Sequence, residues 1–199
     1  VTMQRRGERL VELGRVDGLG PDEQIKAVRW FDDLAVVVTF RQTDPLYTVD
    51  LADPADPRLL GTLKIPGFSD YLHPIGPDLL MGVGYANARE TKAQVSLFDT
   101  SDLAAVRQTD TVVYPGARVL APDDPRSFTW LPEHDTALTV VRAGRQVSIA
   151  VLQVADGRLT SRLVPVEYGD DDREVRTMGL PDGRVVLVTG EDVSFLDLP

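Results

Sequence analysis

One order of events recurs four times along the chain, and this internal repeat constrains the fold more than any single motif. Each unit has a short apolar run, a turn rich in Asp or Gly, a second and a third apolar run, and then an Asp. The third runs, each with its Asp, span residues 46–50, 95–99, 147–156 and 193–197. Short runs that are rich in β-branched residues and bounded by turn formers predict strands, so we expect an all-β protein.

The length and strand content of the units predict the architecture. A fourth strand-like run follows in three units, at residues 58–65, 105–113 and 158–166. Units of roughly 40 to 50 residues with four strands each are typical of propeller blades. A twisted four-stranded blade cannot bury both faces alone, but blades stacked around an axis bury each other's faces. We therefore predict a β-propeller-like array of about four four-stranded antiparallel blades, at approximately residues 25–66, 70–114, 127–167 and 174–199.

The fourth unit lacks a fourth run of its own. Residues 10–16 precede the first unit and resemble residues 59–65, which have the pattern of an outermost strand. We predict that residues 10–16 complete the last blade by pairing with residues 193–198, within one chain or by a swap between two copies. Residues 1–199 would then form a single propeller domain or a partial propeller. Because the sequence does not begin with Met, we expect a fragment of a longer protein.

Composition narrows the classes of partner. About 43% of the residues are apolar, which is enough for a real core, and 31 acidic residues oppose 21 basic ones for a net charge of −10. This charge disfavours nucleic acid and anionic membrane surfaces as partners. No run approaches the roughly 18 apolar residues of a membrane span. Cysteine is absent, which excludes disulfides, thiol chemistry and cysteine-ligated metals.

Motifs for catalysis and cofactor binding are missing. The sequence has no Gly-x-Ser-x-Gly elbow, no phosphate loop and no His-Glu-x-x-His motif. The glycines of Gly82-Val83-Gly84 end a predicted strand, and no third glycine follows at the offset of a dinucleotide loop. We interpret them as a close-packing site and expect no cofactor. The Asp after each third strand has a local role available, since its carboxylate can cap the backbone of the following turn.

Five residues are candidates for binding a ligand: Arg41, Asp44, Asp70, Tyr71 and His73. The first two flank a turn between strands, where they could pair with each other and fix the loop or make a polar contact at one mouth of the ring. The other three lie in a predicted innermost strand, which would line the central channel. A structural, hydrogen-bonded role is the plainer interpretation of the histidine.

The other histidine and the densest acidic cluster point to solvated loops. His134 lies in a Glu-His-Asp turn, where we expect it to be solvated. The run 170–172 is all Asp, with Glu167 and Glu174 nearby, and carboxylate oxygens suit hard cations such as Ca²⁺. The spacing matches no calcium loop, so we interpret the run as a solvated connection and predict no metal site.

Three segments carry a family resemblance. They are FRQTDPLYTVDL at 40–51, LGTLKIPGFSDYLHP at 60–74 and SLFD at 96–99. Together they resemble secreted bacterial and archaeal proteins with a C-terminal β-propeller domain. The resemblance implies a propeller, an exported or surface-attached parent protein and no established activity. The family's Asp-His-Lys-Ala-Phe-like run is replaced here by Asp-Pro-Arg-Ser-Phe at 124–128, so any role of that histidine does not carry over to Pro125.

Two functional hypotheses follow from these observations. The first is a non-catalytic binding scaffold of an exported or cell-surface protein, which contacts a protein, peptide or glycan through its loops or channel mouth. The absence of a nucleophile-base pair favours it. The second is a glycan-active hydrolase or lyase at the channel mouth, where Arg41, Asp70, Tyr71 and His73 would have to converge.

Overall fold

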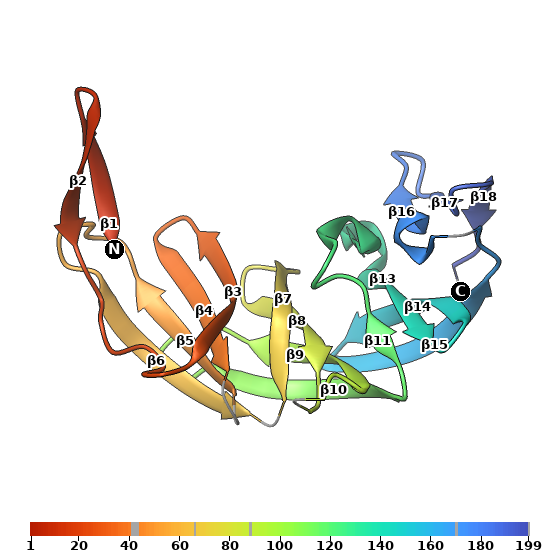
Figure 1. The fold of residues 1–199 in the computed structure, drawn as a ribbon, viewed down its shortest axis with the longest axis horizontal. Coiled ribbons are helices and arrows are strands. Elements are labelled where there is room, and N and C mark those ends of the chain that lie inside the picture. The colour runs from red at the N-terminus through yellow and green to blue at the C-terminus, as the bar shows by residue number, and fades with distance from the viewer. Residues whose placement is uncertain (41–43, 66, 88, 170, 199) are drawn as a thin grey trace.

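The computed structural model describes residues 1–40, 44–65, 67–87, 89–169 and 171–198. In these residues the regular elements are antiparallel strands and three short 3₁₀ turns. Successive sheets stand side by side along an open arc, with a hairpin at the N-terminal end and the last sheet at the other end (Figure 1). This arrangement confirms the predicted all-β array of stacked blades.

The first two blades have the predicted four strands in simple up-and-down order. Blade 1 consists of β3 (Gln24–Phe31), β4 (Leu34–Phe40), β5 (Asp44–Asp50) and β6 (Arg58–Ile65). Blade 2 consists of β7 (Phe68–Pro74), β8 (Leu79–Tyr85), β9 (Lys92–Asp99) and β10 (Arg107–Pro115).

The other two blades depart from the four-strand plan. In blade 3 the innermost position is shared by two short strands, because β11 (Arg118–Val119) and β12 (Phe128–Leu131) both pair with β13 (Thr136–Ala143). Its remaining strands are β14 (Gln146–Ala155) and β15 (Arg158–Val166), and the turns η1 (Pro125–Ser127) and η2 (Pro132–His134) flank β12. The turn η3 (Asp172–Glu174) precedes blade 4. Blade 4 has three strands, which are β16 (Arg176–Gly179), β17 (Val185–Val188) and β18 (Val193–Leu196).

The core lies between blades rather than within any one of them. One buried cluster joins Val36 and Val38 of blade 1 to Leu72, Leu80 and Phe98 of blade 2. A second and larger cluster joins blades 2 and 3, and a third joins blades 3 and 4. Each blade therefore buries its faces against its neighbours, as the physical argument for stacking requires.

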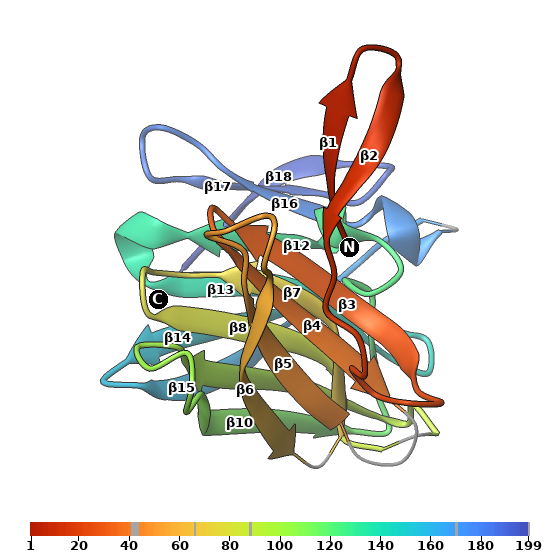
Figure 2. The ribbon, with the colours of Figure 1, turned by 90° about the vertical axis from the view of Figure 1, so that its left-hand side faces the viewer.

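The predicted pairing of residues 10–16 with residues 193–198 is wrong within the chain. Residues 9–14 form β2 (Arg9–Gly14), which pairs with β1 (Thr2–Arg6), and among the described residues β18 pairs only with β17. The two segments lie at opposite ends of the arc (Figure 1), so the hairpin is in front of the last sheet when the molecule is viewed from the hairpin side (Figure 2). Gly7 supplies the positive φ of a tight turn, so β1 is an immediate local partner whose loop costs far less entropy than long-range closure.

Two local predictions are confirmed. The carboxylate of Asp50 accepts from the Ala52 amide at 2.9 Å, and that of Asp99 accepts from the Ser101 amide at 2.9 Å, so both cap the turn after a third strand. In blade 3 the corresponding Asp156 instead takes a positive φ in the β14–β15 turn. Gly84 is a close-packing site, since a β-carbon there would lie 2.1 Å from the carbonyl oxygen of Phe68.

Candidate functional site on the inner strands

The first strands of blades 1 and 2 each carry a bulge, and the two bulges face one another. The ladder register shifts between Ile25 and Ala27 in β3 and between Ser69 and Tyr71 in β7, which leaves Lys26 and Asp70 outside regular pairing. The ammonium of Lys26 lies 3.5 Å from a carboxylate oxygen of Asp70, with side chains 21% and 15% exposed. Bulges re-aim side chains in this way where a strand must present them to a site.

The Lys26–Asp70 pair lies between two phenylalanine rings and a polar pocket. The ammonium of Lys26 lies 4.8 Å from the ring centroid of Phe68 and 5.9 Å from that of Phe40. Burial raises the pKa of Asp70, while the charge of Lys26 acts in the opposite direction. A pocket of about 200 Å³ opens beside them, lined by Lys26, Asp70, Tyr85, Glu90, Arg118, Pro122 and Asp123.

Tyr71 and His73 form a second group that contacts blade 3. The phenol oxygen of Tyr71 lies 3.0 Å from Nδ1 of His73. The ring of Phe128, from β12, packs against both, with centroids 5.2 Å and 4.8 Å away. The guanidinium of Arg29 lies 4.8 Å from the centre of the Tyr71 ring, and its Nε donates to the carbonyl of Leu72 at 2.6 Å.

The electrostatics keep both members of the Tyr71–His73 pair neutral. Burial raises the pKa of Tyr71. Burial, followed by the nearby charge of Arg29, lowers the pKa of His73. A neutral phenol can donate to the neutral imidazole in the tautomer that carries its proton on Nε2. The pair is thus suited to hydrogen bonding and ring stacking, and neither group is poised to ionise near pH 7.

The structure groups the predicted site residues only in part. Asp70, Tyr71 and His73 share β7, but the contacts of Asp70 are to Lys26 and the polar pocket, whereas Tyr71 and His73 contact Phe128. Arg41 lies outside the described residues. Asp44 begins β5, and its side chain also lies outside the described part. The proposed Arg41–Asp44 pair therefore stays a prediction.

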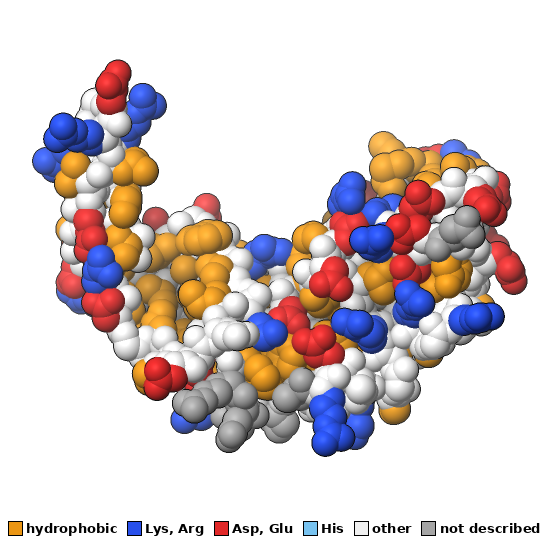
Figure 3. Space-filling view, in the orientation of Figure 1, with side chains coloured by type: hydrophobic (Ala, Val, Ile, Leu, Met, Phe, Trp, Pro, Cys, Tyr) orange, Lys and Arg blue, Asp and Glu red, His pale blue; other side chains and the backbone are white. Residues whose placement is uncertain are grey.

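A larger charged cleft, which sequence reasoning missed, adjoins the pocket through Arg118 and Asp123. It has a volume of about 490 Å³ and lies between blade 3 and the connection at residues 171–173 that leads to blade 4. Figure 3 shows acidic and basic side chains interleaved over the middle of the arc on the near side. The lining residues are Arg118, Val119, Leu120, Asp123, Asp124, Arg142, Asp171, Asp172 and Arg173.

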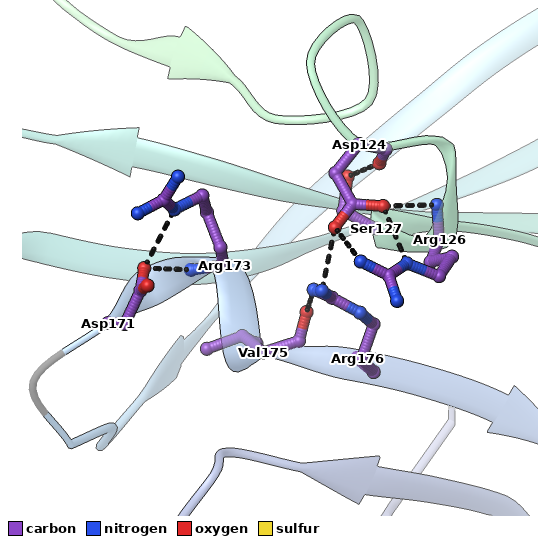
Figure 4. Close-up of polar contacts among 7 residues, drawn as sticks. All are labelled: Asp124, Arg126, Ser127, Asp171, Arg173, Val175 and Arg176. Atoms are coloured by element: carbon purple, nitrogen blue, oxygen red, sulfur yellow. Dashed lines mark hydrogen bonds and ion pairs between the residues drawn. The ribbon is translucent and has the colours of Figure 1, made fainter.

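Arginine-carboxylate contacts organise this cleft (Figure 4). Asp124 accepts from the backbone amide and Nε of Arg126, both at 3.0 Å, and from the guanidinium of Arg176 at 2.7 Å. Asp171 repeats the local half of this pattern with Arg173, at 3.0 Å and 3.1 Å. The hydrogen bonds from Arg126 lead the causes that lower the pKa of Asp124.

An Asp-x-Arg signal in the sequence could have found these turns. In four such tripeptides the arginine Nε bonds the carboxylate two residues earlier, at 56–58, 124–126, 171–173 and 182–184. Spacing of this kind is visible without a structure. The long-range contact from Arg176 to Asp124 is not, because it joins separate blades.

The acidic run and His134 have ordinary partners. Asp171 and Asp172 pair with Arg173 and Arg142, and Asp170 lies outside the described residues. In the part of the chain that the structure describes, no three His, Asp or Glu side chains are grouped to hold a metal ion. His134 is exposed, as predicted, although its Nε2 lies 3.2 Å from the carbonyl of Gly183. Among the described residues no helix is long and apolar enough to span a membrane.

Comparison with known proteins agrees with the blades and their packing. Residues 1–170 match the family described as "Beta propeller domain". The chain belongs to this family. The resemblance noted from the sequence is thereby confirmed at the level of the family.

The similar proteins are uncharacterised or share only the fold. An uncharacterised protein of Archaeoglobus fulgidus is 44% identical over 106 residues, which is 53% of this chain and 17% of that protein. One of Methanocaldococcus jannaschii is 46% identical over 98 residues, 49% of this chain and 15% of that protein. The computationally designed Ika4 protein aligns over 94% of this chain and 99% of its own, with a TM-score of 0.50 at 13% identity. The chain thus spans less than a fifth of either archaeal relative.

Proposed function

We propose that this propeller segment is a non-catalytic binding scaffold of an exported or cell-surface protein. Its binding surface would be the pocket at Lys26 and Asp70 together with the adjoining cleft between blade 3 and residues 171–173. The observation that carries the proposal is the Lys26–Asp70 pair, which two facing bulges hold against aromatic rings at the mouth of a polar pocket. Interleaved charges beside aromatic faces suit a polar ligand with apolar patches, such as a glycan, a peptide or a protein loop.

The neutral Tyr71–His73 pair supports binding over catalysis. A general base needs a pKa near the working pH, and burial raises the pKa of Tyr71 and lowers that of His73. The pair instead offers aromatic surface and hydrogen bonds that do not change with protonation near neutrality. Nothing in the relatives' descriptions assigns an activity.

A glycan-active hydrolase is the second candidate, and one observation favours it. Asp70, whose pKa is raised, shares its pocket with Glu90 and Asp123. A protonated and an ionised carboxyl group flanking one bond is what glycoside hydrolysis requires. The ammonium of Lys26 opposes this role, because it stabilises the ionised form of Asp70.

The test compares binding with turnover on the same variants. Purified chain would be applied to arrays of neutral, acidic and amino-sugar oligosaccharides and of peptides, and to chromogenic glycosides. We expect at least one class to bind without turnover, with affinity falling about tenfold in Asp70→Asn and in Arg118→Gln. Asp182→Asn is the matched control, since Asp182 is exposed and lies outside the pocket and the cleft.

The outcomes separate the two candidates. Glycoside turnover that Asp70→Asn abolishes would establish the hydrolase and overturn the scaffold. Binding that all three variants leave unchanged would remove this surface from the proposal.

A further inference from the structure

The hairpin of β1 and β2 stands apart from the four blades, and most of its residues are exposed. Met3 is 55% exposed and Leu10 70% exposed. A two-stranded hairpin is at best marginally stable in water when nothing covers it. Its contacts with blade 1 indicate which part of a blade the hairpin corresponds to.

The hairpin docks on blade 1 through a threonine and a glycine on paired strands, and blade 1 docks on blade 2 through the same two residue types. In blade 1, Thr48 of β5 lies opposite Gly61 of β6, and the Thr48 hydroxyl donates to the carbonyl of Leu103 at 2.5 Å. In the hairpin, Thr2 of β1 lies opposite Gly14 of β2, and the Thr2 hydroxyl donates to the carbonyl of Pro54.

The two glycines, Gly61 and Gly14, allow the same close approach of the next blade's backbone. A β-carbon on Gly61 would lie 2.6 Å from the carbonyl oxygen of Leu103, and one on Gly14 would lie 2.7 Å from that of Pro54. Both carbonyls belong to the connection between the third and fourth strands of the next blade.

Those two connections have the same local structure. Asp53 caps the amide of Ala55 at 2.9 Å, and Asp102 caps that of Ala104 at 3.0 Å. Pro54 and Leu103 occupy the middle of these turns. The hairpin therefore has the same position relative to blade 1 that the outer two strands of blade 1, β5 and β6, have relative to blade 2.

The sequence of β2 agrees with this equivalence. It begins with an arginine, Arg9, as do the fourth strands of blades 1, 2 and 3, at Arg58, Arg107 and Arg158. The sequence predicted an outermost strand at residues 10–16 in the last blade, whereas the docking of β2 points to a blade on the N-terminal side of blade 1.

We propose that β1 and β2 are the third and fourth strands of a further blade, and that the free edge of β1 takes two antiparallel strands from polypeptide on the N-terminal side of Val1. In blades 1 and 2 the second strand leads directly into the third, so the same order places the missing pair ahead of β1. The archaeal relatives extend far beyond the matched segment, which leaves room for such strands. The proposal is independent of any ligand.

The outer face of blade 1 specifies the chemistry of these strands. A groove of about 200 Å³ between the hairpin and this face is lined mostly by apolar side chains, including Val28, Trp30 and Val37, and Trp30 is 70% exposed. On the opposite face, Val36 and Val38 of blade 1 pack against Leu72 and Leu80 from the first two strands of blade 2. The added strands must therefore present aliphatic residues toward Trp30.

The chain itself provides the probe. A copy of residues 24–46 would be fused ahead of Val1, so that the copied β3 and β4 precede β1 as the originals precede β5. We expect amide exchange in β1 to slow at least tenfold and the unfolding midpoint to rise. A blue shift of the Trp30 fluorescence should accompany this, read in a Trp130→Phe background in which the tryptophan of the copied segment is also replaced by phenylalanine. The matched control carries Val36→Asp and Val38→Asp in the copied segment only.

Three outcomes decide the matter. Protection in the fusion and none in its control supports the proposal. Equal exchange of β1 in both fusions overturns it, and so does a dimer of the unfused chain in which β1 is already protected. A separate Gly14→Val variant should release the hairpin from residues 53–57, and retained protection there would contradict the docking argument.

Discussion

At the scale of single residues, the inner strands obtain their chemistry from register irregularities and long-range neighbours. Lys26 and Asp70 meet because each occupies a bulge. His73 takes its environment from Arg29 of one neighbouring blade and Phe128 of the other. Removing one neighbour should therefore change the titration of His73 without a substitution in its own strand.

We predict that Arg29→Gln raises the pKa of His73, because the variant removes the positive charge that opposes imidazole protonation. The measurement is an NMR titration of the His73 ring, with Arg15→Gln in the distant N-terminal segment as the control. A lowered pKa in the folded state means that the neutral form is favoured. The contribution of His73 to stability is then present above its unfolded value near 6.5 and is lost as pH falls through the folded value. The variant should be less acid-sensitive in this window, and an unchanged titration would contradict the assignment.

At the scale of elements, the strands could be predicted from sequence, and their partners only where they were local. Alternating apolar runs with Asp or Gly turns placed the strands of blades 1 and 2, because hairpin neighbours pair with each other. The two-part inner strand of blade 3 was missed, since β11 is only two residues long. Only part of the candidate site could be predicted from the sequence. Asp70, Tyr71 and His73 share a strand and were predicted. Lys26, Arg29 and Phe128 were not, because they approach that strand only through the stacking of blades.

Asp124 joins two elements, so its loss should cost more than that of an isolated turn. Its side chain is 12% exposed, caps η1 and pairs with Arg176 of β16. We predict that Asp124→Ala lowers the free energy of unfolding by about 2 kcal/mol, from the lost cap and a half-buried arginine left without its partner. Urea unfolding would measure this, with Asp182→Ala as the control in an exposed Asp-x-Arg turn.

The pH dependence supplies a second readout for Asp124. A carboxyl group whose pKa is lowered on folding stabilises the protein above its unfolded value, and this contribution is lost as pH falls through the folded value. The difference between wild type and Asp124→Ala should therefore shrink on acidification from pH 5 toward pH 2. A constant difference would mean that packing rather than the charge carries the effect.

At the scale of the whole molecule, the stability of each blade depends on having neighbours on both sides. Blades 2 and 3 share the largest buried cluster, while blade 4 has three strands and exposes Met178, Val193 and Phe195. In an array of stacked units, local opening begins at the ends and spreads inward.

We predict that native-state hydrogen exchange follows this order. Amides of β16–β18 and of the hairpin should exchange about a hundredfold faster than those of β8, β9, β13 and β14. Mass spectrometry of peptic fragments would resolve the difference. Uniform protection along the chain would show instead that the arc unfolds as one cooperative unit.

The two ends of the arc are different surfaces, a hairpin with a free strand edge at one end and an apolar three-stranded sheet at the other. Contact between unlike ends of identical molecules is heterologous, so its geometry either closes into a ring or repeats without limit. The curvature set by the angle between neighbouring blades is then what separates a closed assembly from a growing filament.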